Sequence, residues 1–270
     1  MILGYHGIGS LGTSDDPLQL YVPPEGLSAQ VRSLQRRGYE FVTMSEFADR
    51  ASAGGKPPPG VAALTFDDGT VDHATVLPAV LEQLGVPGTV YVCPGLSGQP
   101  YPWASIEASV RFMTDEEMVE LSAHPLIEIG AHTNEHRELH EADAKTALAE
   151  MTACKERLEA MLGVEIVSFC YPRCHYSADA RASAPRAGFK SAVTCGLRGS
   201  WDLYELKREV LHSCDGPLVA GLRTRGRYSG LGGSFQARAL RRVILTLDRI
   251  VSMVSRRSQA YVPAVTLFIL

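Results

Sequence analysis

The stretch AALTFDDGTVDHATVLPAVLEQLGVPGTVYVCP, residues 62–94, decides the fold class of this chain. Its first seven residues, AALTFDD, are typical of a buried strand, and HATVLPAVLEQLG (73–85) is typical of a helix that ends at Gly85. TVYVCP (89–94) is typical of a second strand. Alternating strands and long helices form parallel βα units, so we expect either a β/α barrel or a doubly wound sheet. In both architectures the chemistry lies at the carboxyl ends of the strands.

The same alternation continues along the chain. We expect further helices at about residues 27–37, 114–123, 141–163 and 177–188, the last interrupted by Pro185. We expect further strands at 126–133, 166–172, 191–195 and 206–212. In the helix at 114–123, Thr114 is the expected N-cap and Glu117 stands at the capping-box position. A strand opens the chain, and the run AGGKPPPG (53–60) is typical of a boundary loop.

Charge divides the chain into two parts. With 270 residues, 45% of them apolar, the chain can bury one large core or two small ones. Residues 216–270 carry nine Arg and one acid, Asp248, whereas residues 1–215 carry 17 basic and 29 acidic residues, so charges of +8 and −12 make up the net −4. We therefore expect one domain over residues 1–215 and a distinct basic extension after it.

Residues 237–257 of this extension predict an amphipathic helix. One side carries Arg238, Arg241, Arg242, Arg249 and Arg256, and the other carries Leu240, Val243, Leu247, Ile250, Val251 and Val254. The helix either packs its apolar side on the domain, or lies on an anionic membrane surface or a partner protein. Nucleic acid is disfavoured, because the rest of the chain is acidic and no recognition motif accompanies the arginines.

Cysteine usage and the lack of targeting signals indicate the compartment. The six cysteines, at positions 93, 154, 170, 174, 195 and 214, form no CxxC pair and are too sparse for a disulfide scaffold, which favours a reducing compartment. The sequence shows no secretory signal peptide and no run of about 18 uncharged apolar residues. We therefore expect a cytoplasmic protein, peripheral to the inner face of the membrane if the basic helix binds there.

Two adjacent acids, Asp67 and Asp68, follow the first core strand in TFDDG (65–69). Adjacent side chains of an extended segment point to opposite sides, so the two carboxylates would have different functions. An Asp-Gly turn without catalytic function is the alternative.

Two histidines, His132 and His136, follow the strand LIEIGAHT in the motif HTNEH. At this spacing they share one face once the chain turns helical, which suits two imidazoles that bind one metal ion. An acid from another strand end would complete a set of two His and one carboxylate, which leaves coordination positions open for water and substrate. That set predicts a catalytic rather than a structural metal site.

A third strand ends in FCYPRCH (169–175). Cysteine and histidine commonly bind zinc, and this segment contains Cys170, Cys174 and His175. A structural zinc site needs four closed ligands, however, and no second Cys pair lies near in the sequence, so we do not expect zinc there.

Together these stretches resemble the polysaccharide deacetylase family, whose NodB-homology domain is also carbohydrate esterase family 4. LTFDDG (64–69) and HTNEH (132–136) match its first two motifs, FCYP (169–172) resembles the F-x-Y-P form of the third, and the resemblance covers about residues 61–212. It implies a distorted β/α barrel, here with a strand–helix segment before the core and the basic helical extension after it. It also implies hydrolysis of N-acetyl groups on amino sugars with one divalent metal ion.

Residue by residue, the resemblance implies Asp68, His132 and His136 as the metal ligands and Asp67 as the catalytic base. A metal-bound water would be deprotonated with the help of this base as it attacks the amide carbonyl. The oxyanion would be held by the metal and by a backbone N–H, here that of Arg173. Zinc is the first expectation for the metal, and cobalt, nickel and iron also suit these ligands.

The general acid has two candidates. A lone His beside an apolar strand, such as His6, is usually structural, and in many family members the acid is a late His, for which His212 is the candidate. The pattern from Gly188 to Val210, however, resembles a branch that includes the poly-N-acetylglucosamine deacetylases and takes its acid from an N-terminal Y-H-x-I motif. Residues 5–8, YHGI, match that motif, so His6 is favoured and His212 is the alternative.

Arg208 matches the arginine of the same branch. We expect it to pair with Asp67, either to keep the base ionised or as a structural salt bridge. Two positions depart from the family pattern, since Cys170 stands where an Arg is common and Cys174 where a Gly is common. These departures leave the shape of the oxyanion loop and the substrate open.

The expected substrate is an N-acetylated saccharide, small or linked to a nucleotide or a lipid. Within the same fold, the alternative is a non-sugar amide, such as a cyclic ureide or imide or an acylated natural product. From another class, the alternative is a non-catalytic saccharide-binding domain. The presence of both Asp and both His speaks against the last.

Overall fold

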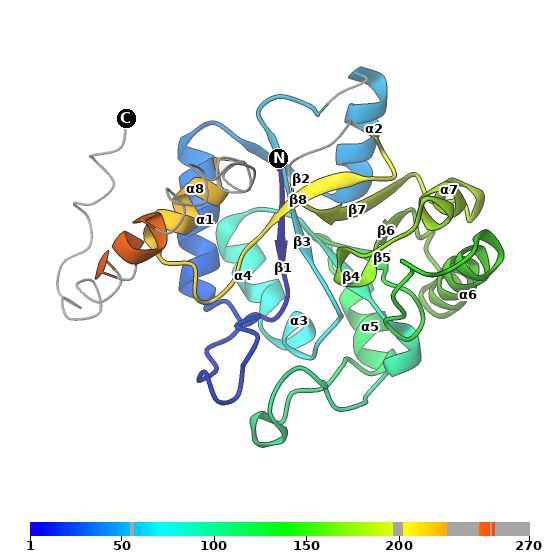
Figure 1. Ribbon diagram of the computed structural model, residues 1–270, viewed down its shortest axis with the longest axis horizontal. Coiled ribbons are helices and arrows are strands. Elements are labelled where there is room, and N and C mark those ends of the chain that lie inside the picture. Colours follow the sequence, from blue (N-terminus) through cyan, green and yellow to red (C-terminus); the bar gives the residue numbers. More distant parts are fainter. Residues whose placement is uncertain (55–56, 197–201, 226–242, 249, 252–270) are drawn as a thin grey trace.

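The computed structural model describes residues 1–54, 57–196, 202–225, 243–248 and 250–251. Within these ranges eight parallel strands form one sheet that closes on itself (Figure 1). The strands are β1 (Ile2–Tyr5), β2 (Glu40–Val42), β3 (Val61–Phe66), β4 (Gly88–Val92), β5 (Ile127–Ala131), β6 (Ser168–Cys170), β7 (Ser191–Cys195) and β8 (Leu206–Val210).

Strand β1 closes the barrel. It pairs with β3 on one side, where Ile2 is opposite Ala63, and with β8 on the other, where Leu3 is opposite Glu209. The ring therefore consists of β1 and β3 to β8, and β2 pairs along the first half of β3. The expected distorted β/α barrel is confirmed. The opening strand, expected before the core, is itself part of the barrel wall.

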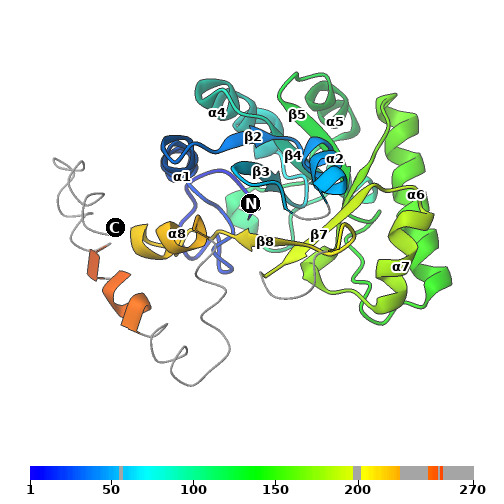
Figure 2. The same ribbon diagram turned by 90° about the horizontal axis from the view of Figure 1, so that it is seen from above.

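Helices surround the barrel (Figure 2). They are α1 (Pro24–Arg36), α2 (Met44–Gly54), α3 (Asp72–Thr75), α4 (Leu77–Leu84), α5 (Asp115–Ser122), α6 (Ala144–Leu162), α7 (Ala178–Arg186) and α8 (Pro217–Arg223), with short 3-10 turns η1 (Pro94–Leu96), η2 (Ile106–Ala108) and η3 (Pro172–Cys174).

Local sequence explains where these helices begin and end. Thr114 caps α5 and forms the expected capping box with Glu117. Asp143 caps α6 by accepting the N–H of Thr146, so this helix begins later than residue 141. The expected helix at 73–85 is instead two helices.

That break lies at the start of α4, where Pro78 is one of the first two residues. Proline lacks the N–H that would continue the hydrogen-bond ladder from α3, and its ring crowds the preceding turn. Gly85 ends α4 in the left-handed conformation, with φ of 64°.

Side chains of the strands alternate between two hydrophobic clusters. Leu64 and Phe66 of β3 belong to the larger cluster, which also contains residues of the surrounding helices. Val61 and Ala63 face the barrel lumen, in a smaller cluster that contains residues of other strands and also Met44 and Phe47 of α2. The same alternation, continued beyond the end of β3, directs Asp67 to the lumen.

The basic extension begins with α8. Asp248, its single acid, is buried, and its carboxylate accepts the N–H groups of Gly216, Leu218 and Val219 at the start of this helix. Residues 243–248 and 250–251 are helical, in agreement with the predicted helix.

On the predicted apolar side of that helix, Val243, Leu247 and Ile250 are 54%, 48% and 47% exposed. Its predicted basic side lies outside the described residues, as do most residues of 226–270. In the part of the chain that the structure describes, no helix has the length and apolar character required to cross a membrane.

Candidate active site

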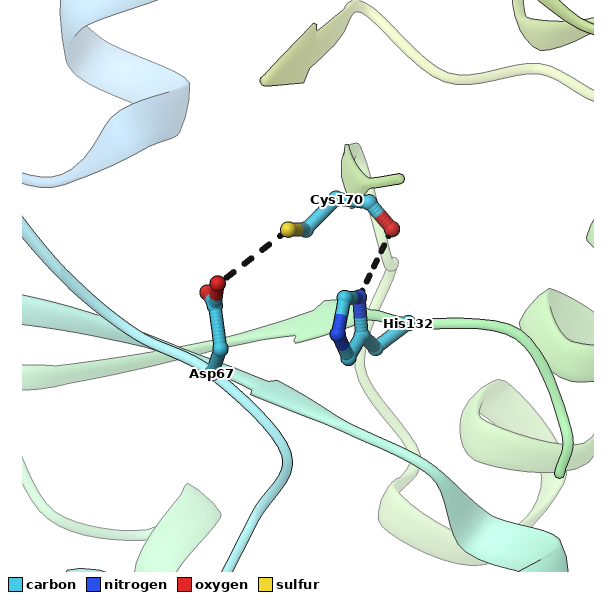
Figure 3. Close-up of side chains that lie close together, drawn as sticks. All are labelled: Asp67, His132 and Cys170. Atoms are coloured by element: carbon cyan, nitrogen blue, oxygen red, sulfur yellow. Dashed lines mark hydrogen bonds between the residues drawn. The ribbon is translucent and has the colours of Figure 1, made fainter. Parts of the chain in front are cut away.

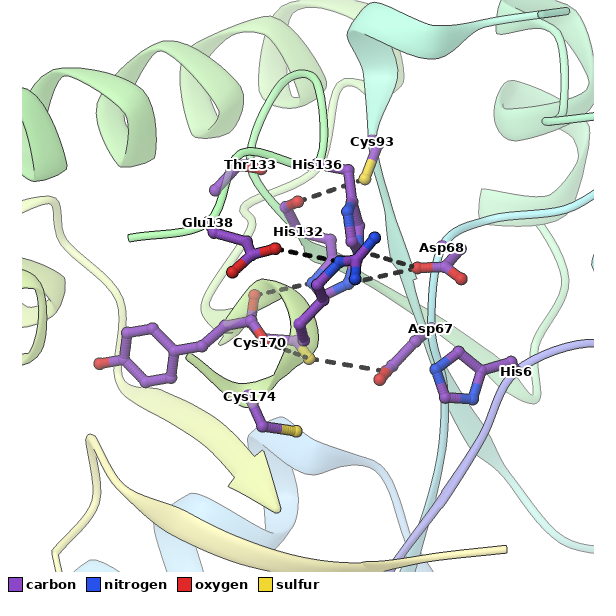
Figure 4. A network of polar contacts seen from close by, with 12 residues as sticks. His6, Asp67, Asp68, Cys93, His132, Thr133, His136, Glu138, Cys170 and Cys174 are labelled. Carbon is purple, nitrogen blue, oxygen red and sulfur yellow. Dashed lines mark hydrogen bonds and ion pairs between the residues drawn. The ribbon is translucent and has the colours of Figure 1, made fainter. Parts of the chain in front are cut away.

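Three predicted residues meet at the carboxyl end of the barrel. His6 follows β1, Asp67 follows β3, and Arg208 lies in β8 with no exposed surface. Tyr5 is opposite Phe66 in the β1–β3 ladder, so His6 and Asp67 are the next pair in register. Figure 4 shows their side chains next to each other.

Arg208 and Asp67 form a buried bidentate ion pair. Arg208 Nη1 and Nη2 donate to Asp67 Oδ1 and Oδ2, each at 2.7 Å, and Nη1 also donates to Thr65 Oγ1 at 2.9 Å. Burial acts to raise the pKa of the Asp67 carboxyl, but the charge and hydrogen bonds of Arg208 outweigh it and hold the pKa below its usual value. The expected contact is thus present, and Asp67 is an anion although it is buried.

Asp68 has different partners from its neighbour. Its φ of 75° is left-handed, which turns its side chain out of the strand alternation. Asp68 Oδ1 lies 3.4 Å from Nε2 of His132 and 3.4 Å from Nε2 of His136. Tyr101 donates its hydroxyl to the other oxygen, Oδ2, at 2.5 Å. The adjacent acids therefore face an arginine and a pair of histidines respectively.

His132 and His136 meet through a loop. The expectation that this motif turns helical is wrong, because Thr133 and His136 have left-handed φ values of 61° and 56°. L-residues in that conformation do not continue a right-handed helix. The tight loop nevertheless brings the two ring centroids to 5.0 Å.

Asp68, His132 and His136 fit a divalent metal ion. One ligand atom of each lies within 4.8 Å of the others. The Nδ1–H of His132 donates to Cys170 O at 2.8 Å, the arrangement that directs the Nε2 lone pair to a metal. Burial, and then the nearby His132, lower the pKa of His136 to about 4, so this ring is neutral at pH 7 and can also act as a ligand.

A second grouping, Asp67, His132 and Cys170, also brings ligand atoms within 4.8 Å (Figure 3). Both oxygens of Asp67 are already bonded to Arg208, which also donates to Cys170 Sγ at 3.1 Å. Burial raises the pKa of the Cys170 thiol, so it stays protonated and can donate to Asp67 Oδ1 at 3.6 Å. Cys170 therefore supports the carboxylate and is a poor metal ligand.

His6 and His212, the two candidates for the general acid, lie side by side. Their ring centroids are 6.5 Å apart. His6 Nδ1 is buried, and among the described residues it has no hydrogen-bond partner. His73 Nε2 lies 2.8 Å from His6 O, and Asp72 accepts the N–H of Ile8 at 2.6 Å, so the segment after the two acids holds this strand end in place. Burial, and then the proximity of His6, lower the pKa of His212.

The turn η3 carries Arg173. Its backbone is left-handed at Arg173 and at Cys174, with φ of 52° and 60°. A disulfide joins Cys174 to Cys195 at the end of β7. The left-handed φ of Cys174 is one that glycine adopts most easily, and the family commonly has glycine at this position.

This disulfide removes the support for a reducing compartment and also excludes Cys174 as a zinc ligand. Sequence reasoning missed it because two cysteines 21 residues apart carry no spacing signature. Only the parallel pairing of β6 and β7 brings the two Cα atoms to 5.5 Å.

Two aromatic residues of the site were also missed. Tyr101 and Trp103 come from the loop between β4 and α5, which has no motif; the sequence YPW is its only signal. The Trp103 ring lies 4.5 Å from the His136 ring and 5.6 Å from the Arg173 guanidinium. Trp103 thus covers the edge of the site between the histidine loop and η3.

A family model described as polysaccharide deacetylase matches residues 54–192. This range contains both acids, the HTNEH motif and η3. The protein YxkH of Bacillus subtilis (strain 168) is 28% identical over 193 residues, which are 72% of this chain and 63% of YxkH. The chain thus spans less than two thirds of the length of this curated relative.

Solved structures share the fold. The Streptococcus pyogenes deacetylase PplD in complex with acetate is 24% identical with a TM-score of 0.69, covering 83% of this chain and 96% of PplD. IcaB from Ammonifex degensii is 20% identical with a TM-score of 0.68, covering 83% of this chain and 96% of IcaB. Since the family model spans half of the sequence and includes the acids and histidines that meet at the barrel mouth, this chain belongs to the polysaccharide deacetylase family.

Proposed function

We propose that this protein is a metal-dependent hydrolase that removes N-acetyl groups from an amino sugar or saccharide. The observation that carries the proposal is the convergence of Asp68, His132 and His136 beside a buried carboxylate, Asp67, that Arg208 keeps ionised. Among structures with this fold, PplD is described as a deacetylase in complex with acetate, the acid that such a reaction releases.

A divalent ion held by Asp68, His132 and His136 would supply a water of lowered pKa and would polarise the amide carbonyl. Two imidazoles and one carboxylate suit zinc first, and cobalt, nickel and iron next.

Asp67 acts as the general base. It accepts the proton of the water that attacks the carbonyl carbon, while Arg208 fixes the orientation of its carboxylate. As the new C–O bond forms, negative charge develops on the carbonyl oxygen, and the backbone N–H of Arg173 donates to it.

His6 acts as the general acid. The amine leaves poorly unless it is protonated, so an imidazolium at this position gives its proton to the nitrogen as the C–N bond breaks. The products are acetate and the free amino sugar. His212, with its ring 6.5 Å from that of His6, is the alternative donor.

The test is acetate release from N-acetylglucosamine oligomers, measured on protein stripped by a chelator and then reloaded with zinc. We expect the stripped protein to be inactive and zinc to restore turnover. Asp68→Asn should lose turnover together with the metal ion bound at this site. Asp67→Asn should keep the metal and lose turnover by roughly 10²- to 10⁴-fold, the usual contribution of a general base.

Full turnover in the stripped protein would overturn the metal-dependent mechanism. A zinc-loaded protein that releases no acetate from any N-acetyl sugar, yet hydrolyses cyclic ureides or imides in the same assay, would assign the site to the other substrate class.

A further inference from the structure

A second cluster of ligating side chains lies outside the barrel mouth. Leu139 and Tyr176 form an isolated parallel bridge, and Ser177 donates its N–H to Leu139 O at 3.1 Å. Leu139 is fully buried, and the Tyr176 ring stacks on Tyr171 with centroids 4.4 Å apart. Because side chains alternate along extended segments, the residues beside this bridge project away from the core.

Three of these residues are Glu138, His140 and His175, and their side chains meet. Glu138 Oε2 lies 3.1 Å from His175 Nδ1 and 3.3 Å from His140 Nδ1. One ligand atom of each lies within 4.8 Å of the others. Around a tetrahedral zinc ion with bonds of about 2.0–2.1 Å, ligand atoms are about 3.3 Å apart, which is close to the two distances from Glu138.

The carboxylate of this cluster is held by another residue. Arg173 Nε lies 3.1 Å from Glu138 Oε1, which leaves Oε2 for the two imidazoles. A ligating carboxylate is commonly fixed by such an outer partner. A hollow of about 410 Å³ lies beside two of the three side chains, Glu138 and His140.

We propose that Glu138, His140 and His175 form a second site for a divalent ion of the zinc class. Two imidazoles and one carboxylate favour zinc, copper or nickel over magnesium and calcium, which prefer oxygen ligands. The histidine side chains are 49% and 61% exposed, so water completes the coordination and the ion exchanges more readily than at Asp68, His132 and His136.

This second site is connected to the turn η3. His175 directly follows η3, and Arg173 within it contacts both Glu138 and the Trp103 ring. Arg173 is thus the outer partner of the second site and a neighbour of the first. The proposal does not depend on the reaction assigned to the barrel mouth.

The experiment is a zinc titration of the full chain after removal of bound metal, followed by calorimetry and by metal analysis. We expect the unaltered protein to bind two zinc ions per chain, one tightly and one more weakly. The double variant His140→Gln/His175→Gln should lose only the weaker one, and Asp68→Asn only the tight one. Arg173→Gln should weaken the second equivalent by about tenfold or more, the usual effect of removing an outer partner.

His124 is the matched control, because it also contacts a carboxylate, that of Glu82 at 3.1 Å, but has no second imidazole beside it in the described structure. His124→Gln should keep both equivalents. Calcium and magnesium should not occupy the weaker site. A single equivalent in the unaltered protein, or two in His140→Gln/His175→Gln, would overturn the proposal, whatever the outcome at Asp68.

Discussion

The ion pair of Arg208 and Asp67 is expected to support both stability and turnover. Arg208→Gln would leave a buried carboxylate without a counter-charge, which costs about 3–5 kcal/mol of the free energy of unfolding. It would also lower kcat, because the base loses its orientation. Arg208→Lys should have a stability and a kcat between those of the unaltered protein and Arg208→Gln, because a lysine ammonium keeps the charge but cannot form the two parallel hydrogen bonds of the planar guanidinium. Urea unfolding and acetate release measure the two effects.

Arg111 provides a matched control on the surface. It contacts Glu117 with the same bidentate geometry, at 2.7 and 2.6 Å, but the two side chains are 36% and 23% exposed. Arg111→Gln should cost about 1 kcal/mol or less. Equal losses for Arg111→Gln and Arg208→Gln would contradict the weight given to burial.

His6→Ala is expected to retain the metal but lose amide hydrolysis by about 10²- to 10⁴-fold. An acetyl ester with a good leaving group should be spared, because only the amine needs the proton. The measurement compares both substrates in His6→Ala and in His212→Ala. A selective loss of amide hydrolysis in His212→Ala alone would assign the acid to His212.

At the level of residues, the candidate groups that the sequence predicts lie in short motifs. Asp67, Asp68, His132 and His136 are each fixed by a strand end or the loop that follows it. Tyr101 could not be predicted, because it reaches Asp68 from a loop 33 residues away that carries no motif of its own.

At the scale of elements, the disulfide between η3 and β7 carries a separate prediction. Replacing both cysteines, Cys174→Ser/Cys195→Ser, frees a loop of about 20 residues in the unfolded chain and should cost about 3 kcal/mol of stability. It should also lower kcat, because the Arg173 N–H loses its fixed position. Thermal unfolding and acetate release, each with and without reductant, provide the measurement.

Cys214 is the control, since it is exposed and unpaired with another cysteine. Cys214→Ser should have the melting temperature of the unaltered protein. Reductant should lower the melting temperature of Cys214→Ser but not that of Cys174→Ser/Cys195→Ser. If reductant has no effect on the unaltered protein, the disulfide does not stabilise the fold.

The sequence predicted most elements but not where they are interrupted. The expected interruption at Pro185 is wrong, because α7 runs from Ala178 to Arg186 through this residue. The βα alternation correctly indicated the strands from β3 to β8, because period-2 and helical patterns are local signals. The break before Pro78 and the loop at HTNEH depend on single residues, which a pattern averaged over a helix does not detect. The spacing of His132 and His136 predicted their proximity for the wrong geometric reason.

At the scale of the whole molecule, closure of the barrel was beyond local reasoning. The β1–β3 pairing joins residues about 60 positions apart, with β2, α1 and α2 between them. Such pairing is selected by the packing of the complete ring rather than by either strand alone. Closure is also what places His6 beside Asp67, so the location of the proposed acid follows from the global topology.

The basic extension is expected to bind anionic membranes. The protein should float with vesicles that contain anionic lipid but not with neutral ones, because residues 226–270 carry seven Arg and one acid, and Val243, Leu247 and Ile250 are about half exposed. A chain that ends at Arg225 should not float.

That truncation also removes Asp248 from the start of α8, so Arg241→Gln/Arg242→Gln in the full chain is the better-matched variant. Each arginine near an anionic surface contributes about 1 kcal/mol, so this variant should bind at least about tenfold more weakly. Equal flotation of all three proteins would show that the extension does not bind membranes.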